Sequence, residues 1–199
     1  MFSGIVEAVG KVESVSPAGE TAAVRIASGG LDLSDVAIGD SIAVNGVCLT
    51  VTKLGVAAID FDVSAETLGV TSGFRAGDRV NLEKSLRLDA RIGGHLVSGH
   101  VDAVGEVDEI VEYEGNRVMS VRFPQNLARF FARKGSATVN GVSLTVNSVD
   151  QDRFSVNLIP HTLAATNLGD LDKGNLVNLE IDLVARYVER MLSDTRIDS

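Results

Sequence analysis

An internal repeat is the feature that most constrains the fold of this 199-residue chain. Residues 3–12 match residues 98–107 at seven of ten positions, and residues 44–51 match residues 139–146 at seven of eight, both at an offset of 95. Residues 80–83 recur as residues 177–180 at an offset of 97, so two residues are inserted between these markers. Because the spacing stays constant through turns as well as apolar segments, the sequence predicts two copies of one fold.

The repeat divides the chain into three parts. We predict an N-terminal barrel with its linker over residues 1–95, a C-terminal barrel over residues 96–183, and a helix over residues 184–199. In this last part, apolar residues recur at helical spacing after Asp182, which is placed as an N-cap; they are Leu183, Val184, Tyr187, Val188, Met191 and Leu192. A helix outside two barrels needs a partner for its apolar face, and we expect self-association.

Each copy carries the pattern of short strands joined by tight turns. Asn45-Gly46 and Asn140-Gly141 separate alternating apolar segments, which is the strongest short-range signal for a hairpin. A domain of this size with several short strands has edges to hide, and closing the sheet into a small barrel hides them. We therefore predict a mainly β fold with two similar six-stranded Greek-key barrels plus a C-terminal α-helix.

Composition excludes several classes of function. With 18 Lys and Arg against 27 Asp and Glu, the formal charge is −9, which disfavours nucleic acid as a partner. No apolar run approaches the roughly 18 residues that cross a bilayer, and residues 1–7 lack the basic segment of a signal peptide. The single cysteine and three histidines show no zinc-ligand spacing. We expect a cytoplasmic protein with no metal and no membrane partner.

Five motifs in order resemble the riboflavin synthase family of the α-chain type. They are residues 1–6, 45–51, 93–100, 140–146 and 159–162. The resemblance implies a homotrimer whose site lies between the N-barrel of one subunit and the C-barrel of its neighbour. It also implies the final step of riboflavin biosynthesis: dismutation of two 6,7-dimethyl-8-ribityllumazine molecules to riboflavin and 5-amino-6-(D-ribitylamino)uracil, without cofactor or metal. Lumazine synthase is a further candidate partner in that pathway.

The resemblance also carries site residues onto this sequence. The catalytic candidates are Cys48, His100, Ser41 and Asp182. The predicted substrate contacts in the first copy are Phe2, Gly4, Ile5, Val6, Cys48, Leu49, Thr50, Asp62, Val63, Ser64, Ala65, Glu66 and Thr67. Those in the linker and second copy are His95, Gly99, His100, Val101, Lys134, Ser143, Leu144, Thr145, Ile159, Pro160, His161, Thr162, Leu163 and Ala164.

Each of these residues also has a structural explanation. Cys48 is either a nucleophile toward the lumazine ring or a wall of the pocket, and a small half-buried residue is the plain alternative. His100 either orients substrate or moves a proton, whereas His95 in the linker could serve a turn. For Lys134, the structural alternative is an exposed surface lysine with no role in the site. The repeated threonines and Ser41 could reflect strand propensity and turn chemistry.

Differences between the copies suggest distinct roles for the two pockets. Cys48 corresponds to Ser143, and Ile5 corresponds to His100. Since one lumazine donates four carbons and the other receives them, we hypothesise that the C-terminal pocket contributes His100 and Lys134 across the subunit boundary. The leading alternative function is a lumazine-carrying protein without catalysis, and a purely structural trimer is a third class.

Overall fold

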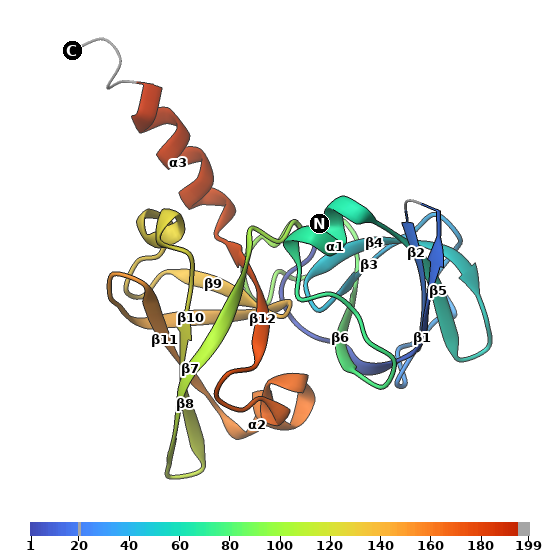
Figure 1. Cartoon of the computed structure of the whole chain (residues 1–199), viewed down its shortest axis with the longest axis horizontal. Helices are drawn as coiled ribbons and strands as arrows, with labels where there is room; N and C mark the ends of the chain where they lie inside the picture. The colour runs from blue at the N-terminus through green and yellow to red at the C-terminus, as the bar shows by residue number, and fades with distance from the viewer. Residues whose placement is uncertain (20, 195–199) are drawn as a thin grey trace.

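The computed structural model describes residues 1–19 and 21–194, which form two closed barrels side by side and a projecting helix (Figure 1). The first barrel closes in the order β1-β2-β5-β4-β3-β6, and every paired neighbour is antiparallel. Its strands are β1 (Ala8–Ala18), β2 (Thr21–Ala27), β3 (Ser41–Val44), β4 (Val47–Leu54), β5 (Ala58–Ser64) and β6 (Arg79–Lys84).

The second barrel repeats this order with the corresponding strands. They are β7 (Ala103–Tyr113), β8 (Asn116–Arg122), β9 (Ser136–Val139), β10 (Val142–Val149), β11 (Arg153–Leu158) and β12 (Leu176–Ile181). The prediction of two six-stranded barrels and a C-terminal helix is confirmed. The turns at Asn45 and Asn140 have φ of 46°, as the hairpin signal requires.

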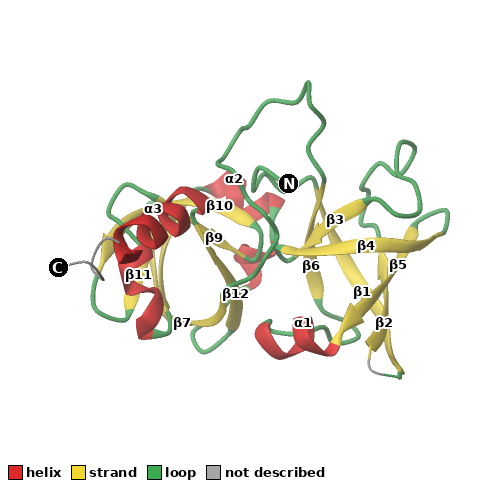
Figure 2. Ribbon diagram, turned by 90° about the horizontal axis from the view of Figure 1, so that it is seen from above, coloured by secondary structure: helices red, strands yellow, loops and turns green. Residues whose placement is uncertain are grey.

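Short helices follow the same strand in each barrel. Helix α1 (Ala65–Val70) comes after β5, and α2 (Pro160–Ala165) comes after β11, followed by the 3₁₀ turn η2 (Asn167–Asp170). A second 3₁₀ turn, η1 (Gln125–Phe130), has no counterpart among the helices of the first barrel as described. Figure 2 shows α1 outside the wall of the first barrel, and Figure 1 shows α2 below the second barrel.

Each barrel has its own core, built by strand alternation. On β4, Val47, Leu49 and Val51 are at most 5% exposed, while Cys48 is half-buried and Thr50 is exposed. Strand β10 repeats this pattern, with Ser143 half-buried and Thr145 exposed. The predicted apolar and polar faces of these strands are confirmed, and the polar face is therefore available for a site.

Buried asparagines join the two barrels at a seam where equivalent residues of the two copies make equivalent hydrogen bonds. Asn45 and Asn140 accept backbone N–H groups of Asn81 and Asn178 within their own barrels. Across the seam, the amide of Asn81 donates to the carbonyl of Asn140, and that of Asn178 donates to the carbonyl of Asn45, each at 2.9 Å. Because these groups are buried and satisfied, they fix how the barrels sit together.

Asn167 breaks the symmetry of the seam. Its amide donates to Asn45 Oδ1 at 2.9 Å and its Oδ1 accepts from Asn81 Nδ2 at 2.8 Å. The corresponding position in the first copy is Ser72, whose backbone N–H alone reaches the seam, through Asn178 Oδ1 at 2.7 Å. The second copy thus supplies more of the seam than the first.

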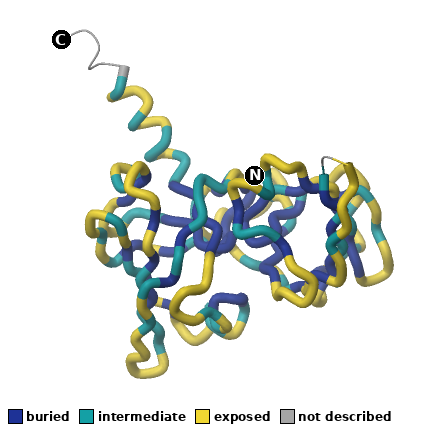
Figure 3. Tube along the Cα trace, viewed as in Figure 1, coloured by how far each residue is buried: buried dark blue, intermediate teal, exposed yellow. Residues whose placement is uncertain are grey.

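Helix α3 (Leu183–Asp194) leaves the second barrel and projects outward (Figure 1). Asp182 accepts from the Val184 N–H at 2.9 Å, as predicted for its N-cap, and Arg186 pairs with Asp102 at 2.8 Å. Figure 3 shows that exposed and half-buried residues alternate along this helix. Five of its exposed residues are large and apolar, each at least 49% exposed: Val184, Tyr187, Val188, Met191 and Leu192. Residues 195–199 of the predicted helix lie outside the described residues.

Replacing Asn167 tests the seam. Asn167→Ala removes one of the two acceptors of Asn81 Nδ2, one of the two donors to Asn45 Oδ1 and the side-chain donor to the Arg79 carbonyl. Losing buried hydrogen bonds costs about 0.5–1.5 kcal/mol each, so we expect the free energy of unfolding to fall by about 2 kcal/mol or more. Chemical denaturation measures this loss.

Ser72→Ala is the matched control, because the Ser72 side chain makes no hydrogen bond among the described residues. It should change stability by less than about 0.5 kcal/mol. Equal losses for the two variants would contradict the assigned role of Asn167.

Candidate active site

A cavity of about 210 Å³ lies beside Cys48 and is lined by both repeats. Its walls come from β4, from α1 and the turn after it, and from the segment that precedes β7. The lining residues are Val47, Cys48, Glu66, Thr67, Val70, Thr71, Gly99, His100 and Val101. We call this cavity the Cys48 pocket. It brings a thiol, an imidazole, a carboxylate and two hydroxyl groups to one place.

Two short segments cross between the barrels; we call residues 3–6 the first strap and residues 98–101 the second strap. They begin where Phe2 and Val97 pair as an antiparallel bridge, with N–H to carbonyl distances of 2.7 and 3.0 Å. Val6 then packs against the core of the second barrel, and Val101 packs against the core of the first. Each barrel is therefore closed in part by the strap of the other copy.

A glycine in each strap contacts a half-buried residue on the polar face of a strand: Gly99 contacts Cys48 on β4, and Gly4 contacts Ser143 on β10. The carbonyl of Gly99 accepts from Cys48 N–H, and that of Gly4 accepts from Ser143 N–H, both at 2.8 Å. Gly99 has φ of 80°, and a Cβ on it would lie 2.6 Å from Cys48 Cβ. The contact requires glycine for both its backbone conformation and its lack of a side chain.

One buried glutamate in each barrel holds the strap of its own copy. Glu180 accepts from Ser98 N–H and Oγ–H at 2.6 Å each, and from Gly99 N–H at 2.9 Å. Glu83 accepts from Ser3 N–H at 2.7 Å, from Ser3 Oγ–H at 2.8 Å and from Gly4 N–H at 3.0 Å. Burial raises the pKa of both carboxyls above the usual value, while these donors act in the opposite direction.

His95 lies against the second barrel and contacts two hydroxyl groups. Its Nδ1 is 2.7 Å from Ser143 Oγ, and its Nε2 is 3.3 Å from Thr138 Oγ1. Burial lowers the pKa of His95 below 6.5, and the negative charge of Asp182 partly opposes this. The neutral imidazole is therefore favoured, with one ring nitrogen able to accept a proton.

The segments around α1 and α2 place further predicted contacts. Ser64 caps α1 by accepting from Thr67 N–H at 3.1 Å, and Thr67 faces the Cys48 pocket. Glu66 lines the same pocket, and its counterpart His161 is exposed on α2. The predicted segment around Asp62 and Thr67 thus contributes Glu66 and Thr67 to the Cys48 pocket.

Several predicted contacts have buried side chains and face the cores instead. Phe2, Val63, Leu49 and Leu144 are at most 8% exposed. Phe2 has no exposed surface and packs under Cys48 with Ala43 and Val97, so its side chain supports the pocket from beneath. At these positions only backbone groups are available to a ligand.

Other predicted residues lie elsewhere. Ser41 pairs with Thr50 across β3 and β4, and neither is among the residues that line the Cys48 pocket. Lys134 is exposed in a left-handed conformation with φ of 69°, and its N–H donates to Val146 as that of Gly39 does to Val51. The backbone turn at Lys134 is therefore the same as the turn at Gly39 in the first copy. The two positions differ in that Lys134 carries a side chain.

The location of His100 corrects the hypothesis that it belongs to the C-terminal pocket. His100 lines the Cys48 pocket of its own chain, because the second strap crosses to the first barrel. Ile5 crosses in the opposite sense with the first strap, toward the side of Ser143. Residues that the repeat aligns with one barrel are thus delivered to the other.

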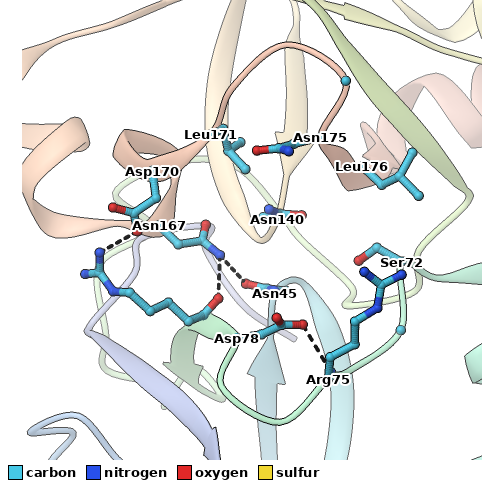
Figure 4. A pocket seen from close by; sticks show the side chains of 13 residues that line it. Asn45, Ser72, Arg75, Asp78, Asn140, Asn167, Asp170, Leu171, Asn175 and Leu176 are labelled. Atoms are coloured by element: carbon cyan, nitrogen blue, oxygen red, sulfur yellow. Dashed lines mark hydrogen bonds and ion pairs between the residues drawn. The ribbon is translucent and has the colours of Figure 1, made fainter.

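A second cavity, of about 580 Å³, is not the candidate site. It is a groove at the asparagine seam, lined in part by Asn45, Asn140 and Asn167, and it contains neither Cys48 nor His100 (Figure 4). In this groove the Arg79 guanidinium pairs with Asp170, and the Asp78 carboxylate accepts from the backbone N–H of Arg75. The groove is the outer surface of the contact between barrels.

Sequence reasoning missed three residues that shape the site. Glu83 and Glu180 stand at equivalent places in the repeated motifs 80–83 and 177–180, and a charge repeated in two apolar strands was the available signal. Thr138, which contacts His95, gave no signal. Among the described residues, no group of His, Cys, Asp or Glu is arranged to hold a metal, and no helix is long and apolar enough to cross a membrane.

Comparison with known proteins places this geometry in a family. The model of the lumazine binding domain matches residues 3–85 and again residues 98–182. Riboflavin synthase of Photobacterium phosphoreum is 46% identical over 195 residues, covering 96% of this chain and 89% of that protein. Riboflavin synthase of Bacillus subtilis is 40% identical over 194 residues, covering 96% and 90%.

Solved structures agree with the sequence relatives. LumP in complex with 6,7-dimethyl-8-(1'-D-ribityl) lumazine superposes with a TM-score of 0.82 at 28% identity, covering 91% of this chain and 99% of that one. LumP in complex with riboflavin gives a TM-score of 0.84 at the same identity and coverage.

Gly99→Ala tests the contact between the second strap and Cys48. The new Cβ would overlap Cys48 Cβ, so we expect the strap to move away and the Cys48 thiol to react faster with iodoacetamide, by about tenfold. Gly115→Ala is the control, because Gly115 has φ of 81° and open space around its Cβ position. If both variants leave the alkylation rate unchanged, the strap does not cover the thiol.

The lowered pKa of His95 predicts a pH-dependent stability. As the pH falls through 6.5 toward the folded-state pKa, the unfolded chain binds more protons than the folded one, so the free energy of unfolding decreases. His95→Gln should lose less stability than the wild type between about pH 7.5 and pH 5.5. Denaturation at both pH values measures this, and identical pH dependences would contradict the assignment.

Proposed function

The chain belongs to the riboflavin synthase family, and on that premise we propose that its two substrates react between the Cys48 pocket of one subunit and the Ser143 region of a neighbouring subunit. The chain is an enzyme that converts two 6,7-dimethyl-8-ribityllumazine molecules to riboflavin and 5-amino-6-(D-ribitylamino)uracil, a transfer of four carbons between like molecules. Its identity to synthases, 40–46%, exceeds the 28% to the LumP structures.

The size of the Cys48 pocket is the observation that carries the proposal of a shared site. Small-molecule pockets usually measure about 300–1,000 Å³, and the Cys48 pocket measures about 210 Å³ with an open mouth. One chain therefore supplies part of the enclosure that a substituted pteridine with a ribityl chain needs. A neighbouring subunit that presents its Ser143 side would complete it and bring a second lumazine against the first.

Helix α3 supports assembly into a homotrimer. Its exposed apolar residues include Val184, Tyr187, Val188 and Met191, while Glu189 and Arg186 join the helix to its own chain through ion pairs. An amphipathic helix of this kind is covered when the same helices of other subunits pack against it. A closed ring of three subunits gives every chain one neighbour on each side, so each Cys48 pocket meets one Ser143 region.

The two sides would contribute different chemistry. On the first side, Cys48 and His100 flank the ring, and Glu66 and Thr67 offer oxygen atoms to the ribityl chain. Holding both lumazines in one enclosure makes their encounter effectively unimolecular, which lowers the barrier by as much as about 7–11 kcal/mol. Positioning is thus a large part of the catalysis we propose.

On the second side, Ser143 and His95 form a pair suited to proton transfer. When His95 carries its proton on Nε2, Ser143 Oγ–H donates to Nδ1 at 2.7 Å and Nε2–H faces Thr138 Oγ1. The neutral imidazole can then draw a proton from the hydroxyl. In the first chemical step the 7-methyl group of one lumazine would lose a proton to Ser143 Oγ while the hydroxyl proton passes to His95 Nδ1, and general-base help of this kind contributes about 10²- to 10⁴-fold.

The predicted cellular setting follows the same proposal. A cytoplasmic enzyme would receive its lumazine from a reaction that closes the pyrazine ring, so we retain lumazine synthase as the proposed pathway partner.

Subunit mixing tests where the site lies. When Cys48→Ala and Ser143→Ala chains are co-expressed, some neighbours combine an intact Cys48 pocket with an intact Ser143 region. In randomly assembled closed trimers this happens at about one quarter of the contacts, so turnover of 6,7-dimethyl-8-ribityllumazine to riboflavin should recover to about one quarter of wild type.

Mixing Cys48→Ala with His100→Ala is the control, because both residues line one pocket of one chain and no mixed trimer restores it. Recovery in this control, or none in the first mixture, would overturn the proposed arrangement.

A further inference from the structure

We propose that Glu180 and Glu83 are positioning residues that act across the barrels: each holds the strap that completes the ligand pocket of the opposite barrel. Glu180 lies on β12 of the second barrel but would govern ligand binding at the Cys48 pocket of the first. Glu83 lies on β6 of the first barrel but would govern the Ser143 region of the second.

A short chain of hydrogen bonds carries the effect from Glu180 to the Cys48 pocket. Glu180 Oε2 accepts from Gly99 N–H at 2.9 Å, and the carbonyl of Gly99 accepts from Cys48 N–H at 2.8 Å. The next two residues of the strap, His100 and Val101, line the pocket themselves. A displacement of Gly99 would therefore move the imidazole and one wall together.

The second carboxylate oxygen fixes the start of the strap. Glu180 Oε1 accepts from both Ser98 N–H and Ser98 Oγ–H at 2.6 Å, and Ser98 Oγ in turn accepts from His100 N–H at 3.3 Å. Hydrogen bonds to an ionised group are among the strongest in proteins, so three donors on one carboxylate hold the backbone of the strap tightly.

The same geometry recurs around Glu83, which makes the pair an internal comparison. Glu83 Oε2 accepts from Gly4 N–H at 3.0 Å, and the carbonyl of Gly4 accepts from Ser143 N–H at 2.8 Å. Glu83 and Glu180 are 5% and 2% exposed, so the two carboxylates differ little in burial. What differs is the pocket that each strap reaches.

A glutamine at either position would disturb its strap while keeping the side-chain size. The amide presents an N–H₂ group where the carboxylate presented an acceptor, so one of the three donors of the strap faces another donor. The loss is local to the strap, since no other side-chain hydrogen bond of Glu180 or Glu83 is described.

The test uses the single cysteine of the chain as a reporter of the first barrel. The full-length enzyme is alkylated with iodoacetamide at increasing riboflavin concentrations, and mass spectrometry gives the concentration that halves the reaction of Cys48. This inference rests on the proposed function, which places a ligand in that pocket. If riboflavin fails to protect Cys48 in the wild type, the proposed placement falls and this inference falls with it.

Once riboflavin is shown to protect Cys48 in the wild type, two glutamine variants test whether Glu180 positions the second strap. Glu180→Gln should raise the half-protecting concentration by about tenfold, the effect of losing one charge-assisted hydrogen bond, whereas Glu83→Gln should change it less than about twofold. The two variants should have similar melting temperatures. An equal loss in both, or a larger loss in Glu83→Gln, would show a general structural role and overturn the inference.

A milder pair removes only one donor from each carboxylate. Ser98→Ala deletes the hydroxyl that binds Glu180, and Ser3→Ala deletes the one that binds Glu83. If Glu180→Gln does not fold, the serine variants test the inference instead. Ser98→Ala should weaken the protection of Cys48 by riboflavin by a larger factor than Ser3→Ala does. The reverse order would overturn the inference.

Discussion

The asparagine seam is the constraint on which the rest of the molecule depends. The buried side chains of Asn81 and Asn178 donate to backbone carbonyls of the opposite barrel, so sliding the barrels apart would break both hydrogen bonds. At the same place Gly46 and Gly141 approach so closely that neither could carry a side chain. With the barrels fixed in this way, a segment of only four residues is long enough to leave one barrel and close the other.

The two halves share a backbone but differ at the residues that do chemistry. The Cys48 side has a thiol and the exposed His100, while the Ser143 side has a hydroxyl hydrogen-bonded to the half-buried His95. The linker creates much of this difference, because it brings His95 to the Ser143 side, where the imidazole contacts the Ser143 hydroxyl. Equivalent pockets on equivalent barrels can therefore hold the same molecule and treat it differently.

Much of the fold could be predicted from the sequence because the repeat includes turn residues as well as apolar ones. Asn45 and Asn140 marked the hairpins, and alternation through Leu49 and Leu144 marked the core faces of β4 and β10. The strap exchange could not be predicted, because a strap folded back on its own barrel and a strap exchanged between barrels have the same sequence pattern. His100 was placed on the wrong barrel for this reason. The contact of His95 with Ser143 could not be predicted either. The two residues are 48 positions apart, and no repeat or hydrophobic pattern links them.

The exchange of straps also bears on how such a chain arose. In a symmetric dimer of single barrels, each partner would lend the other the same segment, as in domain-swapped assemblies. Duplication of the gene and fusion of the copies would turn that exchange into an intramolecular one, whose strength no longer depends on protein concentration. Fusion would also free each copy to diverge, and the replacement of Ile5 by His100 and of Cys48 by Ser143 at matched positions is the kind of divergence that a strict homodimer could never acquire.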